Sequence, residues 1–123
     1  RLDEADARFN QAVMMLHAKR YDMAVKALHR VLELTPLMPE AHSNMGYALL
    51  GTGEYKIAYD FFSTAVELRS MFPNAYYGMA LALEGLGEYE TFINLFSESS
   101  FRKNNLFSIE RSIGTQAHCI VAH

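Results

Sequence analysis

The sequence repeats with a period of 34 residues, and this period constrains the fold more than any other feature. Shifting the chain by one period aligns Tyr21 with Tyr55 and Tyr89, and Gly53-Glu54 with Gly87-Glu88. A period of roughly 20–50 residues is typical of an array in which each repeat is one supersecondary unit stacked on its neighbours. The chain is therefore predicted to be a repeat array rather than a fold with a single irregular core.

Each repeat has the pattern of two helices joined by a short turn. The central repeat, from Pro39 to Phe72, contains two runs of apolar residues at helical spacing, separated by Gly51-Thr52-Gly53. Pro39 and its equivalent Pro73 occupy a first helical turn, where the missing N–H of proline costs little. Glycine permits the backbone conformations of a short turn, so we expect Gly51, Gly53 and their equivalents to form it. The sequence thus predicts an all-α fold of antiparallel helix-turn-helix repeats.

The first hairpin follows the same pattern. Asp3 is the expected N-cap of a helix that runs to about Lys19. A second helix is expected from about Tyr21 to Leu34, where Thr35-Pro36 ends it. The residues expected to face the core of this hairpin are Phe9, Ala12, Met15, Ala24, Leu28, Val31 and Leu32. Small residues recur where paired helices are expected to touch, at Ala12, Ala24, Gly46, Ala58 and Ala80.

The period divides the chain into unequal parts of one domain, residues 1–123. Repeats are expected at about 5–38, 39–72 and 73–100, followed by a C-terminal cap or tail over 101–123. The third repeat is degenerate, because Phe92 stands where a small residue is expected and Ser99 stands where the second repeat has Ala65.

The C-terminal part supports two interpretations. Leu106, Ile109 and Ile113 form an apolar stripe that predicts an extra helix capping the last hairpin, as repeat arrays require. Alternatively, this end extends into the groove of a neighbouring molecule and drives homo-oligomerisation. The first interpretation is favoured.

Composition and charge exclude several classes of function. The net charge of −3 provides no cationic field for a phosphate backbone, so no nucleic-acid partner is expected. No apolar run approaches the ~20 residues of a membrane span, so none is expected in this fragment. The first residue is Arg1, and we expect the chain to be a domain of a longer protein. Cys119 is the single cysteine, which excludes an internal disulfide.

The residue pattern indicates neither an enzyme nor a metal protein. His17, His29 and His42 lie in different predicted helices without a carboxylate or cysteine at ligand spacing. Cys119 and His123 would share a helical face, but a zinc site needs further ligands that are not evident nearby. We therefore predict no catalytic residue, no metal and no cofactor.

Taken together, these motifs resemble the tetratricopeptide repeat family over about residues 5–96. The residues that carry the resemblance are Gly53-Glu54-Tyr55, Gly87-Glu88-Tyr89, Ala24, Ala58 and the segment Leu32 to Pro36. The resemblance implies antiparallel helix pairs stacked into a right-handed superhelix, an α-solenoid. It also implies a concave groove, lined by the first helix of each pair, that holds a peptide or a segment of a partner protein.

Family positions place this groove along three stretches of the chain. The residues that the resemblance assigns to it are Phe9, Val13, Leu16, Ser43, Asn44, Tyr47, Leu50, Asn74, Tyr77, Leu81 and Glu84. One branch of the family clamps a C-terminal carboxylate with basic and amide side chains. Here only Asn44 matches that clamp, whereas Phe9, Val13, Asn74 and Gly78 occupy its other positions. A carboxylate would find no cation, so this branch is rejected.

The remaining expectation is an interaction scaffold with an apolar and aromatic groove. Exposed apolar strips usually mark contact surfaces. We expect the groove to bind an apolar helix or extended segment, with the hydroxyls of Tyr47 and Tyr77 fixing its register. The competing interpretation is that neighbouring helices cover both tyrosines as ordinary core. A second hypothesis for function is self-association, in which the C-terminal tail of one copy packs into the groove of another.

Overall fold

The computed structural model describes residues 3–88 and 90. Five α-helices make up this part of the chain, and it contains no strand. The helices are α1 (Glu4–His17), α2 (Tyr21–Leu34), α3 (Pro39–Thr52), α4 (Tyr55–Leu68) and α5 (Pro73–Leu86). The predicted all-α fold is confirmed. The expected C-terminal cap or tail, residues 101–123, and the end of the third repeat lie outside the described residues.

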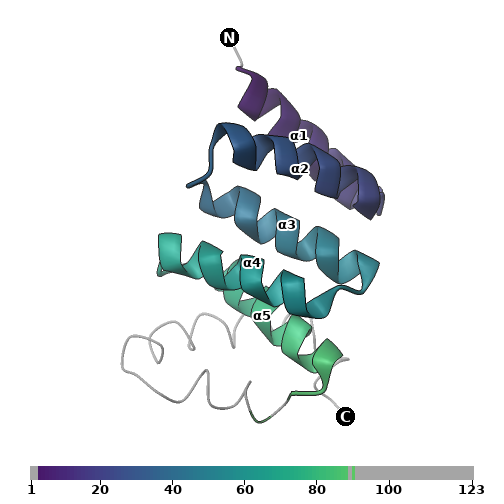
Figure 1. Cartoon of the computed structure of the whole chain (residues 1–123), viewed down its shortest axis with the longest axis vertical. Helices are drawn as coiled ribbons and strands as arrows, with labels where there is room; N and C mark the ends of the chain where they lie inside the picture. The colour runs from purple at the N-terminus through teal and green to yellow at the C-terminus, as the bar shows by residue number, and fades with distance from the viewer. Residues whose placement is uncertain (1–2, 89, 91–123) are drawn as a thin grey trace.

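The helices stack in chain order from α1 to α5 (Figure 1). α1 packs against α2, and α3 packs against α4, as two hairpins; α2 also packs on α3, and α4 on α5. The first helices of successive units also touch, since α1 contacts α3 and α3 contacts α5. This arrangement brings α1, α3 and α5 to one side of the stack, which is where the resemblance places the groove.

The helix ends show how each hairpin turn is made. The backbone N–H of Asp6 donates to Oδ1 of Asp3 at 2.9 Å, so Asp3 is the N-cap of α1 as predicted. α1 ends at His17, two residues before the expected end at Lys19, because Lys19 adopts a left-handed conformation with φ of 60°. The equivalent positions after α3 and α5 are glycines, Gly53 and Gly87, with φ of 83° and 75°.

The structure corrects the expectation for the other glycine of each turn. Gly51 and Gly85 lie inside α3 and α5, not in a turn. A Cβ on Gly51 would lie 2.4 Å from the ring of Tyr21, and one on Gly85 would lie 2.6 Å from the ring of Tyr55. These glycines are therefore required because the tyrosine that begins each second helix packs on the next first helix.

The core contains one large aromatic side chain at its centre. Phe62 of α4 is fully buried between Gly46 of α3 and Gly78 of α5. A Cβ would lie 2.6 Å from the Phe62 ring at Gly46 and 2.2 Å from it at Gly78. The first hairpin has the smaller Leu28 at the equivalent place, also fully buried. Most of the predicted core residues are buried, while Phe9, Met15 and Leu32 are half-buried against the core.

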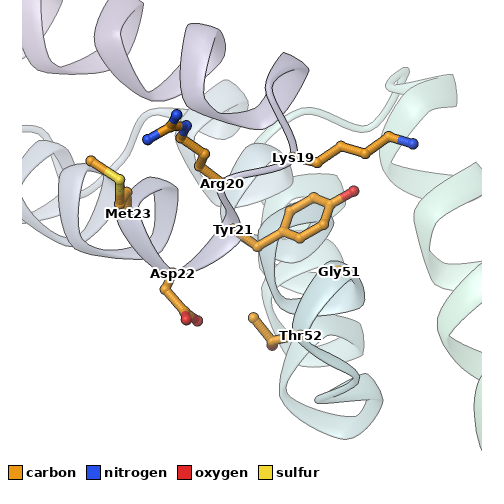
Figure 2. Close-up of a pocket in the computed structure, with 7 residues that line it drawn as sticks. All are labelled: Lys19, Arg20, Tyr21, Asp22, Met23, Gly51 and Thr52. Atoms are coloured by element: carbon orange, nitrogen blue, oxygen red, sulfur yellow. The ribbon is translucent and has the colours of Figure 1, made fainter.

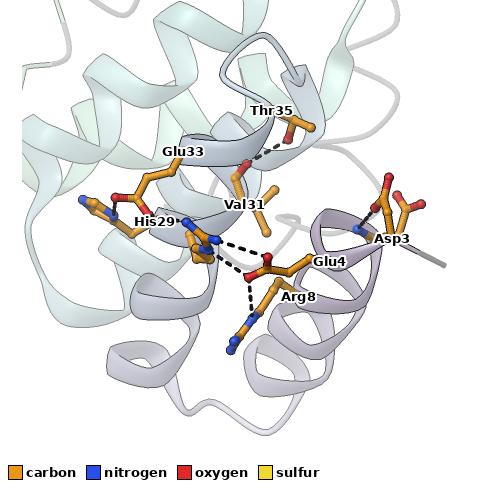
Figure 3. A network of polar contacts seen from close by, with 9 residues as sticks. Asp3, Glu4, Arg8, His29, Val31, Glu33 and Thr35 are labelled. Carbon is orange, nitrogen blue, oxygen red and sulfur yellow. Dashed lines mark hydrogen bonds and ion pairs between the residues drawn. The ribbon is translucent and has the colours of Figure 1, made fainter.

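Ion pairs tie the two helices of each hairpin together at the surface. Arg30 of α2 donates from Nε to Glu4 of α1 at 2.9 Å and also reaches Glu33 (Figure 3). In the second hairpin, Arg69, just after α4, pairs with Glu40 of α3. In both hairpins, the start of the first helix is thus fixed to the end of the second.

Candidate concave groove

The concave face contains a cavity of about 520 Å³ between the first helices. Its lining comes from α1, α3 and α5, together with the first residue of α2. The residues that line it are Val13, Leu16, His17, Tyr21, Asn44, Tyr47, Asn74 and Tyr77. Six of these are among the residues assigned to the groove from the sequence, and the structure brings them to one site.

Five of the assigned residues lie elsewhere. Ser43 is 2% exposed, so its side chain is buried within the protein and cannot meet a partner. Phe9 and Leu50 are half-buried and pack against the core. Leu81 and Glu84 are half-buried residues of α5 that do not line the cavity. The groove that the structure describes is therefore shorter than the sequence suggested.

Tyr47 holds the floor of the groove in place. Its ring meets the ring of Phe62 edge to face, with centroids 4.9 Å apart and an interplanar angle of 78°. Its hydroxyl donates to the backbone carbonyl of Asn74, which links α3 to α5. Burial raises the pKa of the Tyr47 hydroxyl, and the neighbouring Tyr77 raises it further, so the group remains a proton donor. The fold uses the hydroxyl proton of Tyr47, so this proton is not available to a partner.

Asn44 is the polar group that α3 contributes to the groove, beside the ring of Tyr47. Its side chain is half-buried and lines the cavity. Its amide makes no hydrogen bond to any residue within 3–88 and 90. An amide offers two donor hydrogens and one acceptor oxygen, which match the C=O and N–H of a peptide backbone.

The packing of Phe62 explains why α5 has no amide at the position that corresponds to Asn44. Gly78 stands one period after Asn44, and any side chain there would meet the Phe62 ring. α5 therefore contributes Asn74 and Tyr77 to the lining, and no side chain at position 78. At that position the core beneath the groove leaves no room for the polar side chain that the carboxylate clamp needs.

Two lining residues were not assigned from the sequence. His17 stands one period before Gly51, and Tyr21 was interpreted only as the start of a helix. A signal for Tyr21 was present, because Gly51 follows it by 30 residues just as Gly85 follows Tyr55. A tyrosine and glycine that recur together at constant separation indicate a packed pair.

A second cavity, of about 480 Å³, lies beside the turn between α1 and α2. Lys19, Arg20 and Asp22 line it together with Gly51 and Thr52 (Figure 2). Figure 2 shows the side chains of Lys19 and Arg20 extending away from each other on either side of Tyr21. The two cations do not converge on one point, so this cavity lacks the geometry of an anion site.

Residues 3–88 and 90 contain no group of three or more His, Cys, Asp or Glu side chains placed to hold a metal ion. Within the same part of the chain, no helix has the length and apolar character needed to span a membrane.

Comparisons with known proteins agree with the architecture. Residues 18–70 match a family model described as Tetratricopeptide repeat. No curated protein matches the sequence. Residues 18–70 thus match the repeat that the sequence suggested, and the described helix pairs form a right-handed α-solenoid.

Solved structures extend the comparison to the fold. The tetratricopeptide repeat domain of Sgt2 from Aspergillus fumigatus superposes with a TM-score of 0.72 at 18% identity, over 95% of this chain and 83% of that one. MamA superposes with a TM-score of 0.73 at 22% identity, over 92% and 64%. MamA of AMB-1 gives 0.71 at 21%, over 87% and 59%. This chain spans less than two thirds of both MamA chains. At these identities the likeness shows the fold alone.

Proposed function

We propose that the concave groove binds an apolar segment of a partner protein. The observation that carries this proposal is the cavity of about 520 Å³, in which an amide without an internal partner lies among apolar and aromatic side chains. Pockets with mostly apolar walls and a few convergent polar groups are typical of binding sites.

The lining also indicates the chemistry of the partner. No lysine or arginine lines the cavity, and His17 is the one residue in its lining that can carry a positive charge. Val13 and Leu16 on α1 offer an apolar wall, and Tyr77 on α5 offers an aromatic one. A segment with apolar side chains fits this lining, and the Asn44 amide is placed to pair with its backbone.

Tyr47 and Tyr77 have separate roles in this proposal. Tyr47 supports the groove through Phe62 and Asn74, so it is a structural residue. Tyr77 and Asn44 are the side chains that contact the partner. The roles predict different consequences for substitution, and this difference forms the basis of the test.

The test uses peptides selected on the whole chain from a displayed random library, then synthesised and measured by fluorescence anisotropy. We expect Asn44→Ala and Tyr77→Ala to weaken binding at least about tenfold, a loss of ~1.4 kcal/mol. Circular dichroism should show their helicity unchanged. Ile57→Ala, on the outer surface of α4, is the matched control and should bind as the parent does. Peptides that bind both groove variants and the parent equally would refute the proposal.

A further inference from the structure

The outer face of α1 is exposed although the same face of α3 and α5 is buried. Ala41 and Ala75 are fully buried, but Ala7, one period earlier, is exposed. Met14 is 72% exposed, although its equivalent on α3, Ala48, is fully buried. α2 covers this face on α3, and α4 covers it on α5. Figure 1 shows α1 at the N-terminal end of the stack, with no described helix beyond it.

This face has its own shape and composition. A depression of about 660 Å³ lies along it, lined by Ala7, Arg8, Asn10, Gln11 and Met14. Ala7, Gln11 and Met14 are spaced by four and three residues, so they form one stripe along the helix. A small residue near one end, an amide in the middle and a large flexible residue near the other end make the stripe asymmetric.

We propose that this face pairs with the same face of a second copy of the chain, with the two α1 helices antiparallel. In an antiparallel pair, Met14 of each copy lies over Ala7 of the other, so each large side chain meets a small one. Gln11 lies close to the two-fold axis, where amides are self-complementary because each both donates and accepts. A two-fold interface requires this kind of self-matching surface.

Charge supports the antiparallel pairing and the choice of a second copy as the occupant. Asp3, the N-cap, and Glu4, which Arg30 and Arg8 already contact, stand at the start of α1, and Lys19 and Arg20 stand just after its end. Lys19 and Arg20 form no ion pair with residues 3–88 or 90. Antiparallel helices place each acidic end beside the basic end of the other copy, and they also oppose the two helix dipoles.

A different occupant, a regular continuation of the solenoid, fits this face poorly. In the described repeats, the tyrosine of each second helix packs on a glycine of the next first helix, as Tyr21 does on Gly51. His17 occupies the equivalent position on α1, so the same ring would collide with its side chain. Met14 in place of alanine would push such a helix away as well.

The size of the face sets the strength of the dimer. α1 has 14 residues and is therefore about 21 Å long. One pair of such helices buries less than the ~1,200 Å² of stable interfaces, so the dimer is weak and depends on concentration. The interface is separate from the groove, because Val13 and Leu16 line the groove and the outer stripe does not.

The first experiment is sedimentation of the whole chain from about 10 µM to about 1 mM, a range that covers weak association. We expect a monomer at the low end and a growing dimer fraction at the high end, weakened by added salt. Met14→Glu replaces an apolar side chain with a charged one over Ala7 of the other copy, where the interface would remove it from water, and should weaken the dimer at least about tenfold. Met23→Glu on α2 is the matched control, because Met23 is 46% exposed outside this face. A monomer at every concentration overturns the proposal, and so does a dimer that Met14→Glu leaves unchanged.

A second measurement identifies the face directly. In a Cys119→Ser background, Gln11→Cys should form a disulfide-linked dimer when oxidised glutathione is added, because the two cysteines lie close together at the axis. Met23→Cys in the same background should remain largely monomeric. Equal cross-linking of both variants overturns the proposal. Neither outcome bears on the groove, so the two proposals fail independently.

Discussion

The two complete hairpins have the same fold but fill their cores with different side chains. In the first hairpin, Leu28 is the large buried residue and Ala12 is the small residue on the facing helix. In the second hairpin, Phe62 replaces leucine, and Gly46 replaces alanine. The larger ring fits only because the facing helix has lost its Cβ. The comparison teaches that the repeat conserves the combined volume of a facing pair rather than the identity of either residue.

The hairpins differ in their turns for a related reason. Gly53 adopts the left-handed conformation of the second turn without steric cost. Lys19 adopts the same conformation in the first turn, where its Cβ makes it unfavourable. The first turn is therefore strained where the second is relaxed. The repeat pattern tolerates this because one strained residue costs little compared with the burial of a complete hairpin.

The largest expected effect is on the facing pair. We expect Gly46→Ala to lower the free energy of unfolding by about 2 kcal/mol, because its Cβ would overlap the Phe62 ring. Helix propensity alone would raise stability by about 1 kcal/mol, so the sign of the change decides which effect dominates. Urea unfolding followed by circular dichroism measures it.

The rescue of this variant tests the comparison between hairpins directly. Gly46→Ala combined with Phe62→Leu recreates the Ala12 and Leu28 pair of the first hairpin. We expect the double variant to be more stable than the sum of the single changes by about 1 kcal/mol, a normal coupling for contacting residues. If the changes in unfolding free energy are additive, the smaller side chain at position 62 does not compensate for the larger one at position 46.

The strained turn gives a smaller effect of opposite sign. We expect Lys19→Gly to raise the free energy of unfolding by about 0.5–1 kcal/mol, because glycine removes the penalty of the left-handed conformation. The melting temperature of the dilute protein should rise by about 2–4 °C. Lys19→Ala is the control, since it removes the charge but retains a Cβ, and it should not stabilise. If alanine stabilises as much as glycine, the strain is not in the backbone.

The sequence predicted the features that depend on the period and missed those that depend on pairs of repeats. Helix boundaries such as Tyr55–Leu68 followed from apolar spacing, and the start of α3 followed from Pro39. The sequence did not reveal that Gly51 makes room for the ring of Tyr21. That contact joins two repeats, and glycine is also common in turns. The internal role of the Tyr47 hydroxyl was missed because its acceptor is a backbone carbonyl, which leaves no trace in residue identity.

The candidate site shows the same limit. The family resemblance assigned Val13, Asn44 and Tyr77 to one surface, and in the structure all three line the same cavity. It could not show that Ser43 is buried, since burial depends on how closely neighbouring helices approach. That approach is set by side-chain volumes such as Phe62 against Gly78, and these volumes are specific to this chain.

The smallest effect comes from the surface ties, which the two hairpins also build differently. The hydrogen bond from Arg30 lowers the pKa of the exposed Glu4 carboxyl in the folded state. A lowered folded pKa stabilises the fold above the unfolded value of 4.5, and this stabilisation is lost as pH falls through the folded pKa. Glu4→Gln should therefore melt slightly below the parent protein at pH ~7 and together with it at pH ~3. A melting difference that persists at the lower pH would mean that Glu4 acts through packing rather than through charge.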